Sequence, residues 1–415
     1  RCIFHKISSD CCNIILWGAM ISGYVQHGHG LMALDLLEEM QTQGLVPDRS
    51  LFLSALKACC IAGAIKQGKH IHEQIVSMGL DTNVIIGSCL LDMYAKSGNL
   101  VEAQQLFDRL PTRNIVSWGA LIAGYAQHGQ GYVSLKLFSE LLKESVLPDN
   151  FIYSSICKSC SSIGAINEGR CAHDLLIRDG VEIDINLGCT LLDLYAKWGY
   201  LEEMVKIFVS LPYKNVVSWN VLICGYAHHG LYSEALSCFR KMQDIKGVYP
   251  NVVTLLCVLR ACRSTQSLDV GDAIYDEARK KGLLRKELLL GTALVNMYAK
   301  AGDLNKAEEV FDGLPYRNVI SWTALLSGYA ENGQIEEALT CFKRMQLHCV
   351  APSAVTFICC MKACRGIEHI GKGQEIHVLI ETLCLQKDLS VGNALIDMYI
   401  KCGSFSIAQA VFDRL

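Results

Sequence analysis

The sequence predicts an all-α fold, an α-solenoid in which helical hairpins stack into a right-handed superhelix. An internal repeat of about 101 residues is the first sign of this fold in the 415-residue chain. A fixed period of this kind is typical of stacked structural units. Three residue types recur with it, in four copies each: Trp17, Trp118, Trp219 and Trp322; Cys59, Cys160, Cys262 and Cys364; Tyr94, Tyr195, Tyr298 and Tyr399.

The placement of proline is the second sign. Proline terminates a helix and stiffens the chain around it, so a regular series of prolines marks boundaries between helical units. All seven prolines of the chain follow the same period, in two series: Pro47, Pro148, Pro250 and Pro352; Pro111, Pro212 and Pro315.

Each period divides into three segments of 35, 35 and 31 residues, which in the second copy are 115–149, 150–184 and 185–215. Every segment has the pattern of two helices, because two apolar runs at helical spacing are separated by a turn. One such hairpin cannot bury its apolar face alone, whereas stacked neighbours can. The third sign of a solenoid is therefore that every segment is a potential hairpin.

The ends of these helices are predicted from single residues. The first run of a segment stops at a glycine such as Gly98 or Gly199, which suits a left-handed turn. The second helix opens after a cap-like residue, Asn99 or Asp303, and apolar positions such as those in 103–107 follow.

The composition agrees with a large apolar core and excludes some classes. The chain is 51% hydrophobic and 19% charged, and its net charge of -3 lacks the strongly basic balance that alone would indicate nucleic-acid binding. Its 21 cysteines lie mostly in apolar runs, which indicates small reduced core residues. The uncharged window 216–233 is better explained as a buried helix than as a membrane span. Because the chain starts at Arg1 and stops in mid-pattern, we expect it to be a fragment.

At this point the residues resemble a known family. The stretches VSWNVLICGYAHHG, NMYAKAGDLNKAEEVFDGLPYRN and LKAC…GAIKQGKHIH are similar to the pentatricopeptide repeat (PPR) proteins of plants. The alternation of 35, 35 and 31 residues resembles the PLS subclass, with P, long (L) and short (S) motifs. The resemblance divides the chain into one continuous solenoid: the tail of an S motif at 1–13; P motifs at 14–48, 115–149, 216–251 and 319–353; L motifs at 49–83, 150–184, 252–287 and 354–388; S motifs at 84–114, 185–215, 288–318 and, truncated, 389–415.

The resemblance implies sequence-specific binding of single-stranded RNA, with one base read by each P or S motif. Two residues of a motif would read the base, one early in the first helix and one at the motif end. For P motifs the pairs are Gly18 and Asp48, Gly119 and Asp149, Asn220 and Asn251, Thr323 and Ser353; for S motifs they are Ser88 and Asn114, Cys189 and Asn215, Thr292 and Asn318, and Asn393 without its partner.

The side chains of these pairs differ in how well they can form hydrogen bonds to a base. By resemblance, the pairs ending at Asn114 and Asn318 imply adenine, and Asn220 with Asn251 implies a pyrimidine, with cytosine first. The pair ending at Ser353 departs from the usual combinations and suggests a purine only weakly. Glycine has no side chain to offer and cysteine bonds poorly, so Gly18, Gly119 and Cys189 suggest unselective repeats. The L motifs place Leu53, Ser154, Leu256 and Ile358 at the equivalent point, which suggests spacing instead of reading.

Recurrent cations give candidate phosphate contacts. One lysine lies eight residues after each S reading residue, about two turns along the same helix face; the alternative is a cation that favours a helix C-terminus. This S series is Lys96, Lys197, Lys300 and Lys401, and a second series in the L motifs is Lys57, Lys158, Arg260 and Lys362.

The sequence contains no set of residues that predicts catalysis, so we expect neither enzyme activity nor a cofactor. The pair Cys157 and Cys160 has no second pair at zinc-site spacing. The HIHE stretch at 70–73 lacks the Pro-Cys-X-X-Cys partner of zinc deaminases, and His72 recurs on successive triplets as His173, Tyr275 and His377.

The resemblance implies a guide for cytidine-to-uridine editing of mitochondrial or chloroplast transcripts, with the deaminase in a missing domain or a partner. Two alternatives stay open. One is an RNA-binding factor in organelle splicing, processing or stability, and the other is a protein-binding scaffold of tetratricopeptide type. The 31-residue motif does not fit the uniform unit length near 34 residues of that second type.

Overall fold

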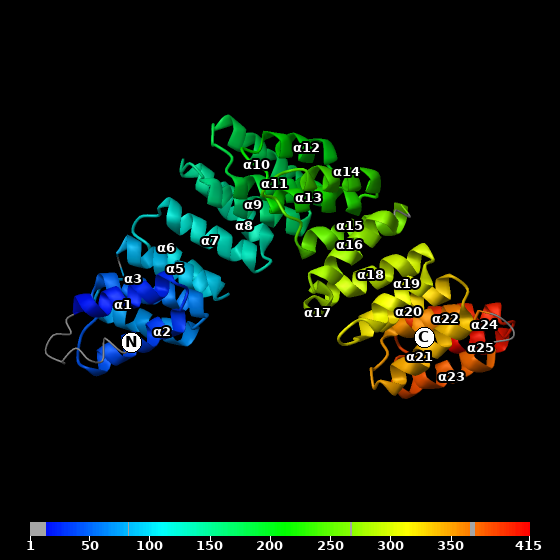
Figure 1. Ribbon diagram of the computed structural model, residues 1–415. Helices are drawn as coiled ribbons and strands as arrows, with labels where there is room; N and C mark the ends of the chain where they lie inside the picture. Colours follow the sequence, from blue (N-terminus) through cyan, green and yellow to red (C-terminus); the bar gives the residue numbers. More distant parts are fainter. Residues whose placement is uncertain (1–13, 82, 266–267, 366–369) are drawn as a thin grey trace. The chain divides into compact units, whose positions relative to one another are not determined.

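The computed structural model describes residues 14–81, 83–265, 268–365 and 370–415, and the predicted S-motif tail at 1–13 lies outside them. Within the described residues the chain forms 25 helices and no strand, which confirms the all-α prediction. The chain divides into two compact units, Arg1–Tyr213 and Lys214–Leu415 (Figure 1).

The first unit contains twelve helices in the described residues. Odd-numbered helices open the hairpins and even-numbered helices close them. Their bounds are α1 Ile14–Gln26, α2 Gly30–Thr42, α3 Arg49–Ala62, α4 Ile65–Ser77, α5 Val84–Lys96, α6 Leu100–Arg109, α7 Ile115–Gln127, α8 Gly131–Lys143, α9 Asn150–Ile163, α10 Ile166–Arg178, α11 Ile185–Lys197 and α12 Leu201–Ser210.

The second unit repeats this pattern with one addition, the single turn α17 inside an L motif. The bounds are α13 Val216–His228, α14 Tyr232–Gln243, α15 Val252–Thr265, α16 Leu268–Lys280, α17 Leu283–Lys286, α18 Leu288–Ala301, α19 Leu304–Asp312, α20 Val319–Glu331, α21 Ile335–Leu347, α22 Ala354–Ala363, α23 Ile370–Thr382, α24 Leu389–Lys401 and α25 Phe405–Phe412.

The hairpins stack in two layers within each unit. Each first helix packs against the first helices before and after it, as α5 packs against α3 and α7. Each second helix instead packs on the first helix of its own hairpin and on the next first helix, as α6 packs on α5 and α7. Within each unit the first helices therefore form a continuous layer, and we call the outer surface of this layer the first-helix face.

The recurrent residues form the core between the layers. Trp118 and Trp322 are fully buried, and each meets a phenylalanine of the preceding hairpin edge to face, with ring centroids 4.6 Å apart. The recurrent cysteines Cys59, Cys160, Cys262 and Cys364 are buried as well. The prolines all lie between helices, so they mark boundaries as expected.

The helix ends follow the predictions except at one cap. Gly98 and Gly199 adopt positive φ angles of 82° and 80°, the left-handed conformation that glycine permits without strain. Asp303 caps α19 by accepting a hydrogen bond from the Lys306 amide at 3.1 Å. Asn99 also precedes its helix, but its side chain accepts no cap hydrogen bond and instead lies 3.5 Å from Glu102 Oε1.

Long side chains bridge the spaces between second helices. Lys69 of α4 reaches Glu102 of α6 at 3.3 Å, and Arg344 of α21 reaches Glu308 of α19 at 2.9 Å. Such exposed pairs contribute about 0–1 kcal/mol each. None of the described helices has the length and apolarity to cross a membrane.

Candidate nucleic-acid interface

Helical spacing gathers the candidate residues of a first helix into one stripe on the first-helix face. In α18 the candidates Thr292 and Lys300 share this stripe with Leu289 and Asn296, because spacings of three, four and four residues return to the same side of a helix. The other first helices carry the equivalent positions, so the face presents parallel stripes from successive helices.

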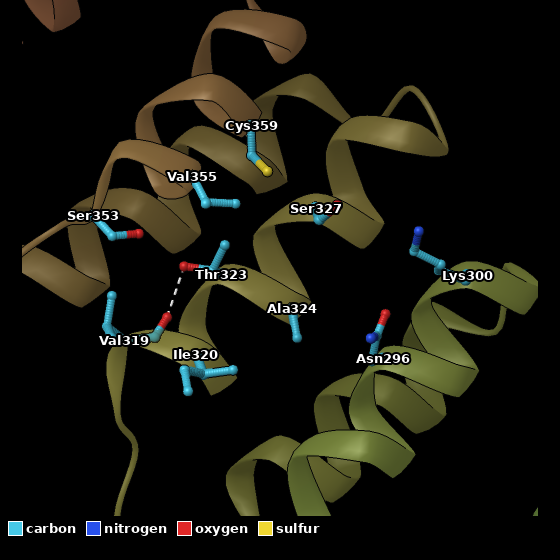
Figure 2. A pocket seen from close by; sticks show the side chains of 10 residues that line it. All are labelled: Asn296, Lys300, Val319, Ile320, Thr323, Ala324, Ser327, Ser353, Val355 and Cys359. Atoms are coloured by element: carbon cyan, nitrogen blue, oxygen red, sulfur yellow. Dashed lines mark hydrogen bonds between the residues drawn. The ribbon is translucent and has the colours of Figure 1, made fainter. Parts of the chain in front are cut away.

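A pocket of about 330 Å³ opens where α18, α20 and α22 meet on this face (Figure 2). Thr323 on α20 and Ser353, the residue before α22, are a predicted reading pair, and both lie in the pocket wall. Ile320 and Val355 flank them and are both 57% exposed, and Lys300 lines the pocket from α18. The structure therefore brings a polar pair, two apolar walls and a cation together.

A second predicted pair is in direct contact. Asn220 on α13 donates from Nδ2 to Oδ1 of Asn251, the residue before α15, at 3.1 Å. Asn220 is only 8% exposed, whereas Asn251 is exposed. Both residues of this pair are also bonded to Thr254 in the first turn of α15.

The motif-end residues have a structural role that their sequence did not reveal. Each precedes a first helix, and its side-chain oxygen accepts a hydrogen bond from the backbone N–H three residues later, at 2.8–3.3 Å. A helix N-cap selects the same residue types as base reading, namely Asn, Asp and Ser. The capping residues are Asp48, Asn114, Asp149, Asn215, Asn251, Asn318 and Ser353.

The other predicted reading residues in the first helices occupy varied settings. Ser88 is buried and donates to the Val84 carbonyl at 2.7 Å, in its own helix, and Thr292 is buried too. Burial raises the pKa of the Cys189 thiol, which keeps it neutral. Gly18 borders open space, and Asn393 is exposed.

Gly119 and the glycine before each S reading residue make close contacts. A Cβ on Gly119 would lie 3.3 Å from the Phe151 ring. A Cβ on Gly291, which precedes Thr292, would lie 2.3 Å from Leu314 Cδ2. Leu314 stands directly before a boundary proline, so the glycine lets the end of the S motif pack under the reading residue.

The predicted phosphate lysines of the S motifs are already engaged. Lys96 lies 2.7 Å from Asp92 Oδ2 and Lys401 lies 3.2 Å from Asp397 Oδ1, in each case one turn earlier in the same helix. Lys300 lies 3.7 Å from Glu331, and Lys197 donates to the Ser161 carbonyl at 2.8 Å. Carboxylates therefore offset much of the positive charge of the S series.

The L series is less neutralised. Lys57, Lys158 and Lys362 are exposed, and no carboxylate of the described residues lies within 4 Å of their ammonium groups. Arg260, the fourth member, donates to His228 Nε2 at 2.9 Å. The L helices thus supply most of the unpaired positive charge at these positions of the first-helix face.

Exposed apolar side chains are a feature that the sequence reasoning missed. They stand three residues before the reading position, are 53–73% exposed, and occur in nine first helices: Ile15, Ile85, Val116, Phe151, Val217, Val253, Leu289, Ile320 and Val355. Side chains that pack the core are buried, so core packing does not explain why an apolar residue recurs at this exposed position. The signal was present in the sequence as a Val, Ile, Leu or Phe at the second position of most first helices.

No metal site forms from the candidates in the described part of the chain, where no three metal-ligating side chains gather. Cys157 and Cys160 are buried in α9, and burial raises the pKa of each thiol to about 12. His70 is exposed on α4, whereas His72 turns toward the next hairpin.

His72 belongs to a recurring contact between L and S motifs. Nδ1 of His72, His173 and His377 lies 2.9–3.0 Å from the hydroxyl of Tyr94, Tyr195 and Tyr399 respectively. In the third triplet Tyr275 replaces the histidine, and Tyr298 donates to Asp272 Oδ1 at 2.6 Å. Burial lowers the pKa of all three histidines.

These histidines predict a loss of stability in acid. Because their pKa is lower in the folded chain than the usual value near 6.5, their neutral form stabilises the fold fully above about pH 6.5. That contribution is lost as the pH falls from about 6.5 through the folded pKa. Urea unfolding measured between pH 7.5 and 5 should show this slope. Replacing all three histidines with the tyrosine that the chain uses at position 275 should flatten it, and an unchanged slope would contradict the assignment.

Comparisons with known proteins identify the family of these repeats. A model described as the PPR repeat matches residues 15–45, 88–115, 116–146, 189–216 and 292–319, and a model of the PPR repeat family matches 214–264 and 317–365. A mitochondrial pentatricopeptide repeat-containing protein of Arabidopsis thaliana is 32% identical over 404 residues, which are 97% of this chain and 39% of that protein. A chloroplastic one from the same plant is 33% identical, over 97% of this chain and 65% of that protein. The chain thus spans only part of the length of these relatives.

Among solved structures, the fold is similar to PPR10, a pentatricopeptide repeat protein crystallised in complex with an 18-nt psaJ RNA element. The TM-score is 0.64 at 18% sequence identity, over 96% of this chain and 63% of PPR10. At this identity the likeness concerns the arrangement of the helical hairpins.

Proposed function

Because this chain belongs to the pentatricopeptide repeat family, we propose that its first-helix face binds single-stranded RNA, with one base for each P or S motif. The observation that carries this proposal is the pocket between α18, α20 and α22. The residues that line it suit the three parts of a nucleotide: apolar side chains for the planar ring, a polar pair for the base edge and a cation for the phosphate.

The pocket walls suit a base inserted between two helices. Ile320 and Val355 are apolar and half exposed in the absence of RNA, so covering them with the two faces of a base would remove apolar surface from water. Thr323 and Ser353 would then meet the base edge. Lys300 would lie near the phosphate, and this contact would replace its ion pair with Glu331.

The N-cap bonds limit what the motif-end residues can offer. When its oxygen is turned toward the cap N–H, an asparagine would present its amide N–H groups, which are donors, to a base. Asn114, Asn251 and Asn318 therefore favour bases with an acceptor ring nitrogen, adenine or cytosine. An aspartate keeps its second oxygen as an acceptor, so Asp48 and Asp149 favour the ring N–H of guanine or uracil.

We propose different tasks for the motif types. The L motifs have mostly aliphatic residues at the reading position and three lysines without a carboxylate nearby, so they would hold the phosphate backbone between the reading repeats. In this proposal the S lysines contribute less, because acidic neighbours offset them.

We also propose that the full-length protein acts on transcripts in mitochondria or chloroplasts, the compartments named for the two relatives above. The alternation of 35, 35 and 31 residues supports a guide role in cytidine-to-uridine editing. The deaminase would lie in a part of the protein outside this chain or in a partner. A role in splicing, processing or stability of organelle RNA is the alternative for the same binding face.

Selection from random single-stranded RNA by the purified chain, at near-physiological salt, tests RNA reading. We expect enrichment of adenine, a pyrimidine and adenine at the spacing set by the motifs that end at Asn114, Asn251 and Asn318. Binding should fall steeply with salt because counterions are released from the phosphates. Absence of any RNA binding would instead favour a protein-binding solenoid.

A single substitution tests the reading pair. Asn220→Thr with Asn251 unchanged is expected to move the preference at that nucleotide from a pyrimidine to adenine, since the pair then matches Thr292 with Asn318. The measurement is the affinity for RNAs that differ only at this nucleotide. An unchanged preference would overturn the assignment of Asn220 as a reading residue.

A further inference from the structure

We propose that Thr254, in the first turn of α15, is a positioning residue for the pair Asn220 and Asn251. By holding both amides in one orientation, it makes the pair present only N–H donors to a base. This inference rests on the proposed function, because it names what sets the specificity of one repeat.

The orientation of Asn251 follows from a backbone donor. The Thr254 backbone N–H can only donate, and it points at the Asn251 side chain at 3.0 Å. The receiving atom must therefore be the amide oxygen Oδ1. The Asn220 atom 3.1 Å from the same oxygen must in turn be a donor, which is Nδ2.

The Thr254 hydroxyl completes a closed set of bonds. It accepts from the Asn251 backbone N–H at 3.1 Å, so its own hydrogen is free to be donated. Asn220 Oδ1 lies 2.5 Å away and Asn251 Oδ1 lies 3.1 Å away, and the shorter contact takes the single hydrogen. Thr254 is fully buried, so water does not compete for these bonds.

The amide hydrogens of Asn251 are then the main polar group left to face a base. Asn251 is the exposed member of the pair, and its Nδ2 makes no hydrogen bond with the described residues. Cytosine offers two adjacent acceptors, N3 and O2, on its pairing edge, whereas uracil places the N3–H donor between its acceptors. A group that only donates therefore selects cytosine over uracil.

The four P motifs vary at the position of Thr254 together with the reading residue. Where the P helix has a glycine at the reading position, as at Gly18 and Gly119, the residue equivalent to Thr254 is apolar, Leu51 or Ile152. Where the P helix has Asn220 or Thr323, the equivalent is a buried threonine, Thr254 or Thr356. The Thr254 hydroxyl also closes a capping box with Asn251 at the start of α15, so its link to base reading rests on its direct contact with Asn220 Oδ1.

Thr356 forms a looser version of the same arrangement. Its hydroxyl lies 2.8 Å from Thr323 Oγ1 and 3.0 Å from Ser353 Oγ. All three groups are hydroxyls, which rotate and can exchange donor and acceptor roles. We therefore expect the repeat with Asn220 to be more selective than the repeat with Thr323.

Thr254→Val tests the inference, because it removes the hydroxyl and keeps the shape. We expect the preference for cytosine over uracil at this nucleotide to fall by about fivefold, the typical effect of one net hydrogen bond. Thr254→Ser keeps the hydroxyl and should restore the preference. The Thr254→Val protein should fold, since Leu51 and Ile152 show that an apolar residue fits this position. If valine does not fit there, Thr254→Ala removes the same hydroxyl and replaces it in the test.

Thr356→Val is the matched control, because it removes an equally buried hydroxyl at the equivalent position after the next P motif. It should leave the cytosine preference opposite Asn220 unchanged. Retention of the full preference by Thr254→Val overturns the role of Thr254, and so does an equal loss in Thr356→Val. If the unchanged protein binds no RNA, the proposed function itself is overturned, which is a different result from either of these.

Discussion

Replacing Lys57, Lys158 and Lys362 together with alanine is expected to weaken RNA binding by about fiftyfold at physiological salt. Each phosphate contact to a single strand contributes about 0.7 to the slope of log affinity against log salt. The loss of three contacts therefore lowers the slope by about 2. If binding at 1 M salt is unchanged, this slope corresponds to the fiftyfold loss at 0.15 M.

The reason lies in the surroundings of these lysines. Their ammonium groups have no carboxylate within 4 Å among the described residues, so their charge is available to a phosphate without breaking an ion pair. Lys96 and Lys401, by contrast, would have to share their charge with Asp92 and Asp397. Salt titrations of RNA affinity measure the effect directly.

A matched control removes the same charge from the other layer. Lys66, Lys136 and Lys343 are exposed on the second helices α4, α8 and α21, and alanine there should leave the salt slope nearly unchanged. An equal loss in both triple variants would mean that only net charge matters. A larger loss on replacing Lys96, Lys300 and Lys401 would contradict the task proposed for the L motifs.

Gly328→Val is expected to lower the free energy of unfolding by about 3 kcal/mol, which is the effect of overpacking a tight helix contact. A Cβ at Gly328 in α20 would lie 2.4 Å from Ala299 Cβ and 3.1 Å from Ala299 Cα in α18. Neither atom belongs to a flexible side chain, so the two helices would have to separate. The pocket spans these helices, and RNA binding by the corresponding repeat should weaken as well.

Gly371→Val is the control for this prediction. Gly371 also lies in a helix, α23, but a Cβ there would meet no atom within 4 Å. We expect no steric cost at this position and a change in stability below about 1 kcal/mol. Urea unfolding of both variants decides the matter, and a Gly328→Val protein as stable as the Gly371→Val protein would show that α18 and α20 adapt freely.

The fold could be predicted in detail because its signals are local and periodic. Trp118 and its copies mark the buried side of a helix, Gly98 and Gly199 mark helix ends, and the prolines mark boundaries. Each of these signals acts through the chain close to it. Asn99 was assigned a cap that the structure does not form, since Asn can bond to Glu102 instead.

The site could be predicted only in part, because its contacts join different repeats. The positions of Asn220 and Asn251 were expected, but the bonds from Thr254 depend on how α13 packs against α15. Lys197 meets a carbonyl of another helix, which no pattern in its own helix shows. The N-cap role of Asn114 was hidden because caps and base readers favour the same side chains.

The N-cap arrangement has a consequence for exchanging repeats between proteins. Since the last residue of one motif is held by the first turn of the next, a module cut at the motif boundary would separate Asn251 from Thr254. A transplanted specificity would then depend on the host sequence that follows. The natural unit for grafting is therefore shifted along the chain, and it ends after the first helical turn of the neighbouring motif.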